Sequence, residues 1–68
     1  KMFILVKGKD DLNDYYELRI NRKHIETIEF VKEESGKFFY NIGMISGRFL
    51  KEVYSDNNQI STTLSYIR

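Results

Sequence analysis

The chain has 68 residues and sets eleven Lys and Arg against ten Asp and Glu, for a formal net charge of +1. Such a short chain forms one domain, here residues 1–68, and buries only about 60% of the surface that its unfolded form exposes. The near-neutral charge provides no strong field toward nucleic acid or a membrane surface. Because cysteine is absent, the sequence excludes disulfides and thiolate metal sites.

The N-terminal residues and the overall composition bear on where the protein acts. The longest wholly apolar run, residues 2–6, is far shorter than the roughly 18 residues of a membrane-spanning helix. It is also too short for the apolar region of a signal peptide, so we expect a cytoplasmic protein. Lys1 precedes Met2, which we expect to be the native start. The lack of alanine and the many Ile, Lys and Asn residues indicate a low-GC bacterium or its phage.

The first third of the chain predicts two strands joined by a polar loop. Residues 2–7 (MFILVK) form an apolar run typical of a strand covered on both faces. Residues 8–14 (GKDDLND) have the glycine and aspartates of a loop. Residues 15–20 then alternate, with an outer face that includes Tyr15 and Arg19 and an inner face made of Tyr16, Leu18 and Ile20. Residues 21–24 (NRKH) break the pattern, and the Asn21 side chain can start a tight turn.

The middle of the chain predicts a hairpin of two alternating strands. In the first strand Ile28 and Phe30 point inward and Val31 points outward. Residues 33–37 (EESGK) form the hairpin loop, where Gly36 supplies a positive φ. Residues 38–45 form the second strand, with an inner face of Phe38, Tyr40, Ile42 and Met44. Gly43, on the opposite face, indicates a bulge or a close approach of another chain segment.

The last third predicts a fifth strand over residues 48–54, after a turn at residues 46–47. Residues 57–67 fit either a helix or a strand. We favour a helix, because Asp56, Asn57 or Asn58 can cap it and the sheet needs a cover for its apolar face. The predicted fold is mainly β (α+β): a five-stranded antiparallel meander or small SH3-like barrel with one C-terminal helix.

Residues 20–29 (INRKHIETIE) resemble the segment that links two strands in FlbD-type flagellar proteins, and similar segments occur in many small phage-encoded β proteins. Those chains follow it with a hairpin, a strand and a C-terminal helix, which is the order predicted here. The resemblance implies a small bacterial or phage accessory protein. It implies no activity.

Groups able to perform catalysis or bind metal are sparse. His24 is the single histidine and lies beside Arg22 and Lys23, so we interpret it as a turn residue. The carboxylates of residues 10–14 and 33–34 lack the spacing of a calcium loop. The four glycines are too dispersed for a phosphate-binding loop. We therefore predict a protein that is not an enzyme and that uses no metal or other cofactor, and no small-molecule substrate is evident.

Aromatic residues give the main functional signal. Five Phe and five Tyr are more than so small a core can readily hide, and an open sheet also leaves unpaired edges. Exposed aromatics mixed with arginine are typical of protein-binding surfaces. We predict an interaction surface made of Tyr15, Arg19, Val31, Phe39, Arg48 and Tyr54. Its partner is another protein or a second copy of the chain; the alternative is a small barrel that binds single-stranded nucleic acid.

Overall fold

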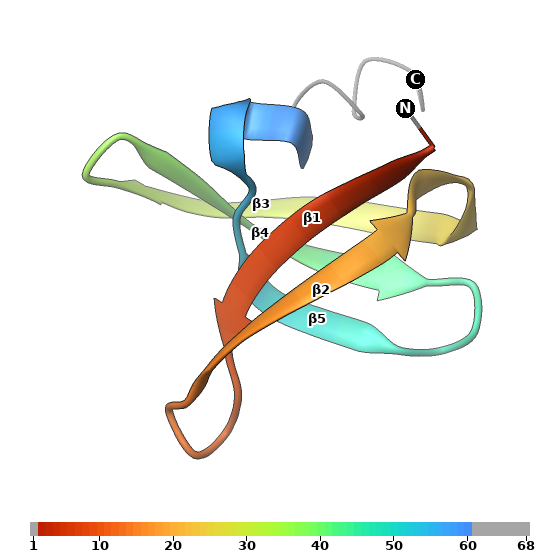
Figure 1. Cartoon of the computed structure of the whole chain (residues 1–68), viewed down its shortest axis with the longest axis horizontal. Coiled ribbons are helices and arrows are strands. Elements are labelled where there is room, and N and C mark those ends of the chain that lie inside the picture. The colour runs from red at the N-terminus through yellow and green to blue at the C-terminus, as the bar shows by residue number, and fades with distance from the viewer. Residues whose placement is uncertain (1, 61–68) are drawn as a thin grey trace.

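The computed structural model describes residues 2–60 and shows a mainly β protein, as predicted. Five strands are present: β1 (Phe3–Lys9), β2 (Tyr15–Asn21), β3 (Ile25–Glu34), β4 (Lys37–Met44) and β5 (Phe49–Val53). Two short 3-10 turns accompany them, η1 (Arg22–His24) and η2 (Asp56–Asn58) (Figure 1). The helix predicted over residues 57–67 lies largely outside the described residues. No helical segment within residues 2–60 is long and apolar enough to cross a bilayer.

The strands form two antiparallel sheets, one of β1–β2 and one of β3–β4–β5. The consecutive strands β2 and β3 do not pair, so a single five-stranded meander is wrong, and no closed barrel is seen among residues 2–60. The β1–β2 hairpin instead crosses over the second sheet (Figure 1). The sheets are joined where Lys7 and Tyr54 exchange two backbone hydrogen bonds of 2.8 and 2.9 Å.

Within residues 2–60, one face of strand β1 is buried and the other, with Leu5 and Lys7, is only half-buried, which corrects the prediction of a strand covered on both faces. Ile4, Val6 and Gly8 are buried, whereas Phe3 is exposed. The reason is the two-sheet arrangement, since the second sheet packs against only one side of the β1–β2 hairpin. The strand also continues to Lys9, so Gly8 belongs to β1 and not to the following loop.

The predicted turns are present, but the turn between β3 and β4 is shorter than the predicted loop over residues 33–37, because Glu33 and Glu34 pair with Phe38 and Lys37. The Asn21 side chain caps η1 by accepting a hydrogen bond of 2.9 Å from the backbone N–H of Lys23. A two-residue turn joins β3 to β4, with φ angles of +54° at Ser35 and +79° at Gly36. Positive φ at both central residues matches the twist of a tight hairpin. Gly47, which follows β4, has a φ of +95°.

The hydrophobic core lies between the two sheets and receives side chains from all five strands and from the segment after η2. The inner faces of β2 and β4 are largely as predicted, although Tyr16, Leu18 and Phe38 lie at the margin of the core. The buried residues of the hydrophobic core are Ile4, Val6, Ile20, Ile25, Tyr40, Ile42, Met44, Leu50, Val53 and Ile60.

The prediction that Phe30 points into the core is only half right. Its ring lies on the inner side and contacts the rings of Phe38 and Tyr40, with centroid distances of 6.1 and 5.8 Å. The side chain is nevertheless 55% exposed. The β3–β4 hairpin extends beyond the strands that cross it (Figure 1), so its outer end has an inner face with little cover. Ile28, nearer the crossing, is half-buried against the core.

Two of the three register shifts in the second sheet change which side chains reach its outer face. The β3–β4 register shifts between Phe30 and Lys32, so Val31 is an extra residue in β3. The β4–β5 register shifts between Tyr40 and Ile42, and Glu52 has a φ of +51° there. The Asn41 side chain compensates by accepting a 2.9 Å hydrogen bond from the backbone N–H of Glu52. Such bulges redirect the side chains that follow them.

Candidate interaction site

A groove of about 460 Å³ lies between the β1–β2 loop and the outer face of the second sheet. Both walls come from segments far apart in the sequence, which the Lys7–Tyr54 bridge brings together. Aromatic rings, lysines and carboxylates line it. The lining residues are Gly8, Lys9, Asp10, Asp11, Asn13, Tyr15, Lys32, Glu34, Lys37, Phe39, Lys51, Glu52 and Tyr54.

Three aromatic residues of the predicted surface meet in this groove. Phe39 projects from β4 and Tyr54 follows β5; their rings meet edge to face, with centroids 5.3 Å apart. Both rings are half-buried. Tyr15, at the start of β2, is 75% exposed and lines the side nearer the β1–β2 loop. Rings fixed by neighbours lose little conformational freedom when a partner covers them, so they suit a binding surface.

Each of these rings carries a lysine ammonium over its face. Lys9 Nζ lies 4.9 Å from the Tyr15 ring centroid, Lys37 Nζ lies 4.7 Å from that of Tyr54, and Lys32 Nζ lies 5.3 Å from that of Phe39. At exposed sites such contacts stabilise by about 0.5–1 kcal/mol. They hold the lysine stems along the rings and place the ammonium groups at the groove.

Lys32 differs from the other lysines of the groove because two carboxylates lie beside its ammonium group. Its Nζ lies 3.3 Å from Glu34 Oε1 and 3.5 Å from Glu52 Oε1, which links β3 to β5 across β4. The hydrogen bond to Glu34, with the charges of both carboxylates, raises the pKa of the Lys32 ammonium. In contrast, no ion pair involves Lys9, Lys37 or Lys51 within residues 2–60.

The β1–β2 loop forms the other wall and is held in shape by its first aspartate. Asp10 Oδ1 accepts hydrogen bonds from the backbone N–H groups of Leu12 (2.9 Å) and Asp14 (3.0 Å). The backbone N–H of Asp10 donates to the carbonyl oxygen of Asp14, and that of Asn13 donates to the carbonyl oxygen of Asp10. The loop therefore presents Asp10, Asp11 and Asn13 to the groove from a preformed conformation.

The other predicted surface residues do not join this groove. Arg19 and Arg48 are exposed and line a separate shallow hollow with Phe3 and His24. Val31, the extra residue of the β3 bulge, is 36% exposed and lines neither the groove nor this hollow. The structure thus brings together Tyr15, Phe39 and Tyr54 and places Arg19, Val31 and Arg48 elsewhere.

The surface predicted from the sequence contains no lysine and no carboxylate, whereas four of each line the groove. Lys9 falls in the loop predicted over residues 8–14, whereas in the structure it is the last residue of β1. Lys32 reaches the outer face only because of the Val31 bulge, for which the local sequence carries no distinct signal.

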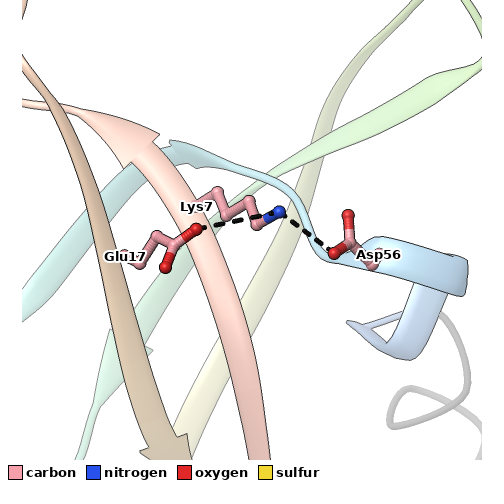
Figure 2. Close-up of polar contacts among 3 residues, drawn as sticks. All are labelled: Lys7, Glu17 and Asp56. Atoms are coloured by element: carbon pink, nitrogen blue, oxygen red, sulfur yellow. Dashed lines mark hydrogen bonds and ion pairs between the residues drawn. The ribbon is translucent and has the colours of Figure 1, made fainter.

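An ion cluster outside the groove fixes the junction between the two sheets (Figure 2). The Lys7 ammonium donates to Asp56 Oδ2 at 3.0 Å and lies 3.8 Å from Glu17 Oε2. The Asp56 hydrogen bond and charge raise the pKa of the Lys7 ammonium. Because Lys7 is the residue bridged to Tyr54, this cluster ties η2 and β2 to the strand that positions the groove.

The described part of the chain contains no cluster of side chains suited to binding a metal ion. Among residues 2–60, no three His, Asp or Glu side chains are grouped so that they could hold a metal ion. His24 is exposed in η1, as expected for a turn residue. Comparison with known protein families, with curated proteins and with solved structures found no match.

Proposed function

We propose that this protein is a non-catalytic protein-binding module and that its groove receives an extended segment of a partner protein. The observation that carries the proposal is the meeting of Tyr15, Phe39 and Tyr54 in one groove, each beneath a lysine ammonium. Partly exposed rings provide contact area, and the polar groups around them provide hydrogen bonds and charge. An accessory role in a bacterium or phage, in the cytoplasm, fits the composition.

Single-stranded nucleic acid is the alternative ligand, because rings beside lysines are also what stacked bases and phosphates require. The carboxylates oppose it. Four of them, Asp10, Asp11, Glu34 and Glu52, line the same groove as the four lysines. A polyanion would meet both signs of charge along its path, whereas phosphate binding draws on a net positive surface. Charge in the groove therefore favours a protein segment.

The peptide-binding proposal predicts that Tyr15→Ser abolishes selection of peptides from a random display library. Tyr15 is 75% exposed and contacts only the Lys9 ammonium among the interactions described, so its removal should leave the fold intact. The matched control is Phe49→Ser, which removes a ring that is 56% exposed and lies outside the groove. Wild type and the Phe49 variant should enrich the same peptides. Equal enrichment on the Tyr15 variant contradicts the proposal.

We further propose that the module self-associates through exposed apolar side chains outside the groove. Leu12 is 82% exposed, and Phe3 and Ile45 are also exposed. Self-association by pairing of β3 edges is unfavourable, because the bulge and the charged residues of β3 discourage pairing with another strand. Light scattering behind size exclusion should show a mass that rises above that of the monomer with increasing concentration. A constant monomer mass contradicts self-association and leaves the groove proposal standing.

A further inference from the structure

The two walls of the groove carry opposite charge. On the loop wall Asp10 and Asp11 outnumber Lys9. On the sheet wall the lysines outnumber the carboxylates, with Lys32, Lys37 and Lys51 set against Glu34 and Glu52. The groove as a whole is balanced, but its charges are separated between a loop and a sheet that face each other. A ligand inside it meets a negative side and a positive side.

The separation of charge between the two walls is greater when only the charged side chains without an ion pair are considered. Glu34 and Glu52 are both engaged by the Lys32 ammonium. Lys37 and Lys51 have no ion pair among residues 2–60, so they are the sheet-wall cations left for a ligand. Across the groove, one Asp10 oxygen is occupied by backbone N–H groups, and no hydrogen bond or ion pair within those residues involves the Asp11 carboxylate.

We propose that the groove selects a protein segment of mixed charge, with a basic side chain directed to Asp10 and Asp11 and an acidic side chain directed to Lys37 and Lys51. This inference rests on the proposed function and names the class of segment that it binds. The rings of Tyr15, Phe39 and Tyr54 line the same groove and provide the apolar contact. A segment of one sign, acidic or basic, gains at one wall and is repelled at the other, which is how like charges reject wrong partners.

The test compares three fluorescein-labelled peptides of equal length by fluorescence polarisation. In the first, arginine and glutamate alternate around a central tyrosine; the second has glutamate at every charged position, and the third has arginine there. A labelled oligothymidylate is the fourth probe. We expect the mixed-charge peptide to bind most tightly to the wild-type protein, with an affinity that falls as salt is added.

Two neutralising variants then assign the walls. Lys37→Gln should weaken binding of the mixed peptide by about two- to fivefold, the range of a partly exposed ion pair. It should weaken the all-glutamate peptide more than the all-arginine one. Asp11→Asn should show the reverse preference. The matched controls Lys23→Gln and Glu26→Gln remove exposed charges outside the groove and should change neither affinity nor preference.

Each of the other possible results contradicts either the mixed-charge assignment alone or the peptide-binding proposal as well. If a single-sign peptide binds as tightly as the mixed one, or if display-selected peptides lack one sign of charge, the mixed-charge assignment is wrong and the peptide-binding proposal stands. If no peptide binds and display enriches nothing, both are wrong. If oligothymidylate binds more tightly than every peptide, both are replaced by the nucleic-acid alternative.

Discussion

Ile42→Ala should destabilise the domain by about 2–5 kcal/mol, the cost of removing a buried side chain and leaving a cavity. Ile42 is 0% exposed at the centre of β4, where it pairs with Ile28 on β3 and Leu50 on β5. A domain of this size is stable by only about 3–10 kcal/mol. The variant should therefore be largely unfolded or melt far below wild type. Thermal and urea unfolding followed by circular dichroism measures the loss.

The matched control is Phe30→Ala, which also removes a large inner-face side chain but from an exposed position. The sequence alone predicts that Phe30 is as important as a core residue. Its 55% exposure lowers this expectation to about 1–3 kcal/mol, because each of its contacts with the Phe38 and Tyr40 rings contributes about 0.5–1.5 kcal/mol, and the loss should stay below that of Ile42→Ala. Equal losses for Ile42→Ala and Phe30→Ala would contradict the described extent of the core.

This pair of residues shows what alternation in a sequence can predict about a β protein. Polar and apolar alternation indicates which face of a strand a side chain lies on, and Ile42 and Phe30 were both placed on the correct face. Alternation carries no information on where the covering sheet ends. Phe30 is 55% exposed and Ile42 is 0% exposed, a difference that arises only when two distant hairpins pack together.

For the candidate site too, the sequence predicted the face on which a side chain lies but not which side chains meet in space. Tyr15, Phe39 and Tyr54 were identified from the sequence because each occupies an outer position of an alternating strand. Arg19 and Arg48 were grouped with them on the assumption of a continuous sheet, but β2 and β3 do not pair. The groove depends on the junction of the two sheets and on bulges at Val31 and Glu52, which follow from tertiary contacts.

Gly8→Ala should destabilise the domain by about 1–3 kcal/mol, the usual cost of overpacking a filled interior. Gly8 is buried in β1, and an added Cβ would lie 2.9 Å from Val53 Cγ1 and 3.0 Å from Tyr16 Oη. Val53 is 0% exposed and belongs to the core, so its side chain cannot move outward into solvent. The strand must shift instead, beside the Lys7–Tyr54 bridge that joins the two sheets. We therefore expect Gly8→Ala to lower both the melting temperature and the affinity of the groove for its peptides.

The physical cause can be isolated by making space for the new methyl group. Tyr16→Phe removes the hydroxyl that the added Cβ would contact, and Val53→Ala removes the other obstacle at the cost of a buried side chain. If crowding is the cause, Gly8→Ala should cost less in either background than in wild type, a non-additivity that a double-mutant cycle measures. Gly36→Ala, which meets no atom within 4 Å but has a φ of +79°, should show no such coupling. Strictly additive losses at Gly8, Tyr16 and Val53 would mean that the close approach of β1 to β5 does not set the geometry of the groove.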